Sequence, residues 1–90
     1  MIYIFPRTRF TECNGVVQQL EHVLSEVREA QEASLTSDIQ HTAEEVMDAM
    51  HSLETLCRIL EEKYAVDMAV IKLNDMIKNA KRGYYASSNV

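Results

Sequence analysis

The chain has 90 residues, and we expect them to form a single domain over residues 1–90. Hydrophobic residues make up 47%, which excludes a disordered chain, and a formal charge of −5 argues against binding nucleic acid through a basic face. No run reaches the roughly 18 apolar residues that a membrane span needs, and no signal peptide is visible. We therefore expect a cytoplasmic protein, with Cys13 and Cys57 as reduced thiols.

The composition favours helices, because two glycines and one proline leave few positions that break them. The first stretch, MIYIFPRTRF, is rich in β-branched and aromatic residues, and Pro6 excludes a helix that continues through it. We expect an extended arm over residues 1–11, a helical body over residues 12–83 and a loosely held tail over residues 84–90.

The first helix is expected from about Glu12 to Ala33. Apolar residues recur there at steps of four and three, which draws one stripe along a helix, and they are Val16, Leu20, Val23, Val27 and Ala30. The second helix is expected from about Asp38 to Tyr64, after an N-cap at Ser37 with Gln40 at capping-box spacing. Its stripe consists of Val46, Ala49, Leu53, Leu56 and Leu60.

The third helix is expected from about Val66 to Lys81, with Val70, Leu73 and Ile77 facing inward. Gly83 is placed just past its end, where a left-handed residue stops a helix. Two long helices and a shorter one are better suited to form half of a helical bundle than a complete bundle. A chain this small also buries only a limited share of its surface. We therefore expect an all-α, three-helix protomer that assembles into a four-helix-bundle-like dimer or tetramer.

Two pairs of carboxylates stand on the first two expected helices. Glu26 and Glu29 are spaced i, i+3 on the first helix, and Glu45 and Asp48 have the same spacing on the second. This spacing places both members of a pair on one side of a helix, one turn apart. If the two helices pack antiparallel across their stripes, the pairs converge at the edge of the interface.

Such a cluster has two interpretations. Like charges at this spacing cost each helix about 0.2–0.5 kcal/mol, and four carboxylates in a partly buried site cost more. A divalent cation removes that cost, and a set of oxygen ligands favours Mg²⁺, Mn²⁺ or Ca²⁺ over zinc. The alternative is a solvated acidic face, because the chain has 14 acidic residues and this spacing is common on exposed helices.

The two pairs resemble the signature of the all-α nucleoside triphosphate pyrophosphohydrolases. Within this family, they are most similar to the MazG-like branch. That family carries EExxE, a spacer of variable length and then ExxD. Here SEVRE, residues 25–29, matches the first motif except at Ser25, and EVMD, residues 45–48, matches the second fully. The run KNAKRGY, residues 78–84, is similar to the end of the family's third helix. The resemblance covers residues 16–84 and leaves the first 15 residues outside it.

The resemblance implies an enzyme that splits a nucleoside triphosphate between the α and β phosphates, giving the monophosphate and pyrophosphate. It implies Mg²⁺ as the cofactor, with Mn²⁺ as an alternative. The residues that it assigns as metal ligands are Glu26, Glu29, Glu45 and Asp48. Glu29 is our choice for the carboxylate that orients or deprotonates the attacking water. Two roles are open for Lys78 and Arg82: they hold phosphate oxygens, in their own or in a neighbouring subunit, or they only stabilise the end of their helix.

Several alternatives stay open. Ser25 departs from the family pattern, so the chain binds fewer ions, or is inactive, if the full acidic set is needed. A non-catalytic helical oligomer, acting as a binding or regulatory module, is the competing function. Asp48 and His51 resemble one half of a di-iron site. His22 is a surface residue or lines the pocket, and the tyrosines at 84 and 85 stack on a base or pack against a partner helix.

Overall fold

The structure is a computed structural model and describes residues 1–86. This part of the chain forms four helices and no strand, which confirms the expected all-α class. The helices are α1 (Phe10–Cys13), α2 (Val16–Ser34), α3 (Ile39–Tyr64) and α4 (Met68–Lys81). Among the described residues, none of the helices combines the length and the apolar character that crossing a membrane requires. Part of the expected tail, residues 87–90, lies outside the described residues.

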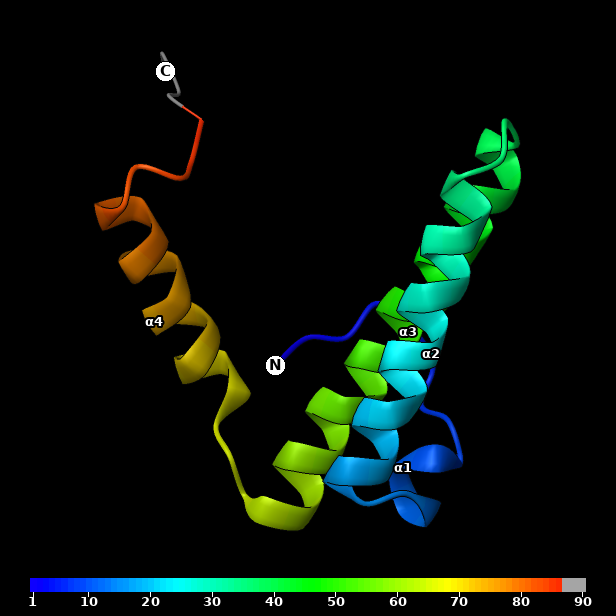
Figure 1. The fold of residues 1–90 in the computed structure, drawn as a ribbon. Helices are drawn as coiled ribbons and strands as arrows, with labels where there is room; N and C mark the ends of the chain where they lie inside the picture. The colour runs from blue at the N-terminus through cyan, green and yellow to red at the C-terminus, as the bar shows by residue number, and fades with distance from the viewer. Residues whose placement is uncertain (87–90) are drawn as a thin grey trace.

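The helices α2 and α3 pack side by side as an antiparallel hairpin, which forms the body of the molecule (Figure 1). The buried apolar residues of the seam between them are Val23, Ala33, Leu56 and Ile59. The N-cap of α3 is Asp38 instead of the expected Ser37. Its side-chain oxygen accepts a hydrogen bond from the backbone N–H of His41 at 2.9 Å, so the helix begins one residue later.

The expected single helix from Glu12 to Ala33 is wrong at its start, so the described chain has four helices instead of three. Asn14 is extended, with ψ of 140°, and Gly15 is the extended N-cap of α2, so the chain leaves one helix and enters another. The ammonium of Lys63 on α3 donates to the carbonyl oxygens of Glu12 and Asn14 at 3.1 and 2.9 Å. These bonds satisfy carbonyl groups that the end of α1 leaves free.

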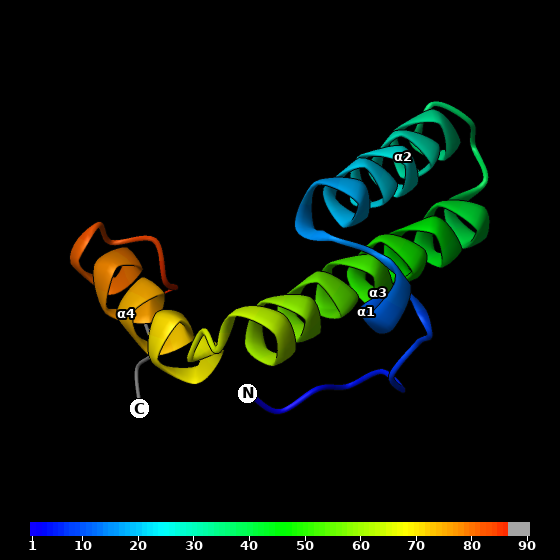
Figure 2. The ribbon, with the colours of Figure 1, turned by 90° about the horizontal axis from the view of Figure 1, so that it is seen from below.

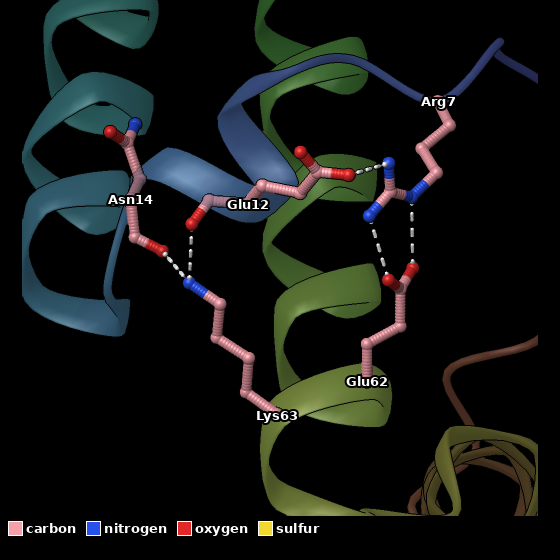
Figure 3. A network of polar contacts seen from close by, with 5 residues as sticks. All are labelled: Arg7, Glu12, Asn14, Glu62 and Lys63. Carbon is pink, nitrogen blue, oxygen red and sulfur yellow. Dashed lines mark hydrogen bonds and ion pairs between the residues drawn. The ribbon is translucent and has the colours of Figure 1, made fainter.

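The N-terminal arm, residues 1–9, lies alongside α3 on the outside of the hairpin (Figure 2). The backbone N–H of Phe5 donates to Glu54 at 2.7 Å, and Arg58 donates to the carbonyl oxygen of Phe5 at 2.9 Å. Figure 3 shows Arg7 between two carboxylates, with Glu62 of α3 at 2.9 Å and Glu12 of α1 at 3.0 Å. Contacts with both α1 and α3 therefore hold the arm.

The expected apolar stripes are only partly buried. Val23 and Leu56 lie in the seam, but Leu20 and Val27 of α2 are 44% and 46% exposed. Val46 and Leu53 of α3 are exposed to the same degree. Neighbouring residues on a helix point about 100° apart, and each helix carries apolar side chains on two adjacent faces. The hairpin uses one face of each helix and leaves the other face to solvent in the single chain.

The inward face expected on the third helix is also wrong for the single chain, because α4 has no buried residue. Its apolar side chains Val70, Leu73 and Ile77 are 46–56% exposed. The chain turns at Ala65, which has a positive φ of 52°, and α4 then runs away from the hairpin (Figure 1). Gly83 has the expected left-handed conformation, with φ of 72°, just past the end of α4.

Candidate functional site

A buried polar contact fixes how α2 and α3 align. The side-chain nitrogen of Gln19, which is 1% exposed, donates to the carbonyl oxygen and to the hydroxyl of Ser52 at 3.0 and 3.1 Å. Because the helices run antiparallel, Glu26, two turns after Gln19 on the same face, meets the part of α3 that precedes Ser52. The pair Glu45 and Asp48 stands on that part of α3.

The structure brings three of the four carboxylates together. One oxygen each from Glu26, Glu29 and Glu45 lies within 4.8 Å of the other two. Glu26 and Glu45 lie on the seam, with side chains that are 17% and 16% exposed, whereas Glu29 and Asp48 are exposed. The oxygen Oε2 of Glu45 is buried and has no hydrogen-bond partner in the described part of the chain.

The positions of the clustered carboxylates disfavour their ionised forms. Removal from water, followed by repulsion from Glu29, raises the pKa of Glu26 above its ordinary value, and Asp48 adds to this. The pKa of Glu45 is raised by the same causes in the same order. The main cause of both shifts is the removal of these carboxylates from water, and the negative charge of their neighbours adds to it. A bound cation, or a proton, would offset that negative charge.

Each glutamate of the seam has a histidine one helical turn before it. The ring nitrogen Nε2 of His22 lies 3.5 Å from Glu26, and Nε2 of His41 lies 3.8 Å from Glu45. His41 also lies 3.9 Å from Glu44, which is 63% exposed. When protonated, the two imidazoles would offset part of the negative charge of the cluster.

Two open cavities adjoin the carboxylates. Glu26 and Asp48 line one cavity of about 360 Å³, together with His22, Thr8 of the N-terminal arm and Phe10 of α1. Glu29 and Glu45 line the other, of about 280 Å³, beside the loop that joins α2 to α3. The carboxylates thus stand between two spaces that solvent and a small ligand can reach.

The remaining candidates lie elsewhere or have other contacts. Lys78 pairs with Asp75 at 3.5 Å, and the guanidinium of Arg82 lies 5.8 Å from the ring of Tyr84. Both basic residues belong to the end of α4, which leaves the hairpin, so one chain does not bring them to the carboxylates (Figure 1). The hydroxyl of Ser25 donates to the carbonyl oxygen of His22 at 2.8 Å, within its own helix.

The N-terminal arm and α1 also contribute to the site. His51 lines the larger cavity with Asp48, but its Nε2 lies 3.2 Å from the carbonyl oxygen of Pro6 and its ring stacks on Phe5 at 4.5 Å. Thr8 and Phe10 line the same cavity. One signal was available for Gln19, a polar residue placed seven residues before Glu26 and therefore on the same helical face.

Comparisons with known protein families, with curated proteins and with solved structures find no match to this chain. The donors are all oxygens, they come from two helices, and they carry more negative charge than the site can neutralise. These properties suit a hard divalent cation better than zinc.

Proposed function

We propose that this chain hydrolyses nucleoside triphosphates to the monophosphate and pyrophosphate with the help of a divalent cation, Mg²⁺ or Mn²⁺. The observation that supports this most is the convergence of Glu26, Glu29 and Glu45 from two helices. The donors fit such an ion, because the pKa of two of them is raised and Oε2 of Glu45 is buried without a hydrogen-bond partner among residues 1–86. The spacing of the pairs resembles the MazG-like motif, which supplies the reaction type.

The ligands in this proposal are Glu26, Glu29, Glu45 and Asp48. Bound there, the ion would neutralise charge on the triphosphate and polarise the α phosphorus. Glu29 is exposed and would accept the proton of the attacking water. The water oxygen bonds to the α phosphorus as the bond between that phosphorus and the bridging oxygen breaks, and pyrophosphate leaves. Positioning and charge neutralisation supply most of the catalysis in such a transfer.

A second copy of the chain completes the proposed enzyme. The open face of the hairpin and the open face of α4 carry large apolar side chains that are about half exposed: Leu20, Leu24, Val27, Val46, Leu53, Val70, Leu73 and Ile77. Apolar surface of this extent marks an interaction surface. We propose that these faces meet in a dimer or tetramer built like a four-helix bundle, in the cytoplasm.

The same assembly would give Lys78 and Arg82 a role. Both lie in or just after the last turn of α4, which projects from its own hairpin. Packed against a neighbouring hairpin, α4 would bring these cations to the neighbour's carboxylates. There they would bind phosphate oxygens of the triphosphate.

The competing function is a non-catalytic helical oligomer. It is favoured by the same exposed apolar faces and by Ser25, which stands where the family carries a glutamate and uses its hydroxyl within α2. The two functions differ in what metal does. A specific site raises the stability of the fold as Mg²⁺ or Mn²⁺ rises, whereas an acidic surface responds only to ionic strength.

Product analysis tests the proposal. The protein is incubated with a panel of ribo- and deoxyribonucleoside triphosphates and either Mg²⁺ or Mn²⁺, and pyrophosphate and phosphate are quantified separately. We expect pyrophosphate and monophosphate in equal amounts, and no products when the metal is chelated. Release of phosphate instead, or of nothing from any triphosphate, would contradict the proposed reaction.

A further inference from the structure

We propose that the cavity between the N-terminal arm, α1, α2 and α3 binds the nucleoside part of the substrate, with Phe10, the first residue of α1, as the surface on which the base stacks. This inference rests on the proposed function, because it states how that same site holds its substrate. The cavity measures about 360 Å³. Pockets for small ligands commonly measure about 300–1,000 Å³, so the space suits one nucleoside and little more.

The walls of this cavity have a polarity that matches a nucleotide. Gln19, His22 and Glu26 line it from α2, and Asp48, Ser52 and Thr55 line it from α3. The three residues on each helix span about two helical turns, or roughly 10 Å along the helix axis. Because the helices are antiparallel, the two acidic residues stand at one end and the uncharged residues stand at the other.

The acidic end adjoins the carboxylate cluster. Glu26 belongs to both the cavity and the cluster, and the charge of Asp48 acts on Glu26 and on Glu45. A triphosphate carried by a cation would sit at this end, so the remainder of the same molecule must extend away from it. The larger cavity offers that molecule a path toward the uncharged end.

The uncharged end offers aromatic faces. The ring of Phe10 is 5.8 Å from the ring of His22, at an angle of 36°, and Phe10 remains 37% exposed. The ring of His51 lines the same space from α3, with one of its faces stacked on Phe5 at 4.5 Å. A nucleobase stacks well on such rings, whichever base it is.

The polar groups at this end are largely paired with one another. Gln19 bonds with Ser52 and also accepts from Asn14 at 2.8 Å, and the hydroxyls of Thr8 and Thr55 are 3.3 Å apart. Strong discrimination between bases needs buried polar groups that only the right base satisfies. We therefore expect the pocket to accept different bases with similar affinity.

The arm is held firmly enough to serve as a wall. Arg7 contacts Glu62 and Glu12, as Figure 3 shows, and the backbone of Phe5 is fixed by hydrogen bonds to α3. These contacts flank Thr8 and Phe10, so the pocket exists before a ligand arrives. A preformed pocket avoids the entropy cost of ordering the arm on binding.

Two substitutions at Phe10 separate stacking from packing. Phe10→Leu keeps apolar volume and removes the aromatic face, whereas Phe10→Tyr keeps that face. We expect Phe10→Leu to raise KM for dATP, dCTP, dGTP and dTTP about tenfold each with kcat unchanged, and Phe10→Tyr to restore KM. Inhibition by inorganic tripolyphosphate with Mg²⁺ should be the same in all variants. The control is Val17→Leu, since Val17 is 72% exposed and lies outside the cavity.

An unchanged KM in Phe10→Leu would overturn the inference, as would an equal loss of tripolyphosphate inhibition. If no triphosphate is hydrolysed at all, the proposed function fails and a second measurement judges the pocket alone. In that experiment deoxyadenosine and deoxycytidine, which carry no phosphate, are titrated without metal while the imidazole NMR signals of His22 and His51 are followed. Shifts in both signals that weaken in Phe10→Leu would support the pocket, and no shift would exclude it.

Discussion

Gln19 of α2 and Ser52 of α3 form the buried polar contact that fixes the alignment of the hairpin. The amide nitrogen of Gln19 donates to both the carbonyl oxygen and the hydroxyl of Ser52, at 3.0 and 3.1 Å. Buried polar groups lose free energy if they lack partners, so a shifted alignment of the helices is unfavourable. The alignment places Glu26 beside Glu45, and the carboxylate cluster therefore depends on a contact two helical turns away.

Replacing Gln19 with leucine should destabilise the fold by about 1–3 kcal/mol, because it leaves the hydroxyl of Ser52 and the amide of Asn14 without their partner. Urea unfolding monitored by circular dichroism measures the change. Gln18→Leu is the matched control, since Gln18 is exposed on the same turn of α2. Equal stability of the two variants would mean that the Gln19 contact does not set the alignment.

The stability of the metal-free protein should depend on the protonation of Glu45. Burial and the charge of Glu29 raise the pKa of Glu45, so the folded chain holds this proton more tightly than the unfolded chain does. The stability that this proton contributes is complete below the ordinary pKa of 4.5 and is lost as the pH rises through the raised value. Glu45→Gln should therefore be more stable than the native chain at neutral pH.

Urea unfolding in a chelator at a series of pH values tests this. The advantage of Glu45→Gln should shrink as the pH falls toward the ordinary carboxylic pKa, where the native side chain also becomes neutral. Glu44→Gln serves as the control, because Glu44 is a neighbouring glutamate that is 63% exposed. An advantage of Glu45→Gln that is the same at acidic and neutral pH would contradict the electrostatic account.

Metal should reverse the order of stability. If Glu45 is a ligand, Mg²⁺ or Mn²⁺ stabilises the native fold by mass action, by about 2.7 kcal/mol at an ion concentration one hundred times Kd. Glu45→Gln should gain little, and Glu44→Gln should gain as much as the native chain. Thermal unfolding over a range of metal concentrations at constant ionic strength measures this. If metal raised the stability of all three chains equally, the metal would only be screening the charges of a solvated acidic face, and Glu45 would not be a ligand.

The open face of α2 should carry the contact between copies. Leu24 lies on that face and is 54% exposed, so Leu24→Lys places a charge where a second copy would bury an apolar side chain. Sedimentation equilibrium should show the native chain as a dimer or tetramer and the variant as a monomer. Leu35→Lys is the control, since Leu35 is 84% exposed at the end of α2. A monomeric native chain would contradict the proposed assembly.

Local sequence patterns predicted the helices well, because they depend on short-range residue choices. The scarcity of breakers indicated the all-α class, and the left-handed residue after α4 falls on Gly83 as expected. The division between α1 and α2 at Asn14 and Gly15 was missed. The dipeptide Asn14-Gly15 is a local turn signal that could have indicated this division. The donor that the carbonyl groups of Glu12 and Asn14 find in Lys63 is distant in sequence and could not be read locally.

The choice of buried face could not be read from the periodicity. Leu20 and Val23 both fit an apolar stripe, yet only Val23 faces α3 in the single chain. The deciding residue is polar, since Gln19 finds a partner in Ser52 only when its own face turns inward. The i, i+3 spacing predicted that both pairs converge, and three of the four carboxylates do so, whereas Asp48 stays outside the group. The individual residues that the arm and α1 contribute to the cavity wall, Thr8 and Phe10, depend on tertiary contacts and were not predicted.

The most direct test of the central claim is the rate of pyrophosphate release from a deoxynucleoside triphosphate with Mg²⁺, compared between the native chain, Glu45→Gln and Glu44→Gln. If the carboxylates on the seam form the proposed site, the native chain and Glu44→Gln release pyrophosphate at similar rates. Glu45→Gln should lose at least about a hundredfold, as expected when a group that acts in the transition state is removed. Equal rates in all three chains, or no release from the native chain, would contradict the claim.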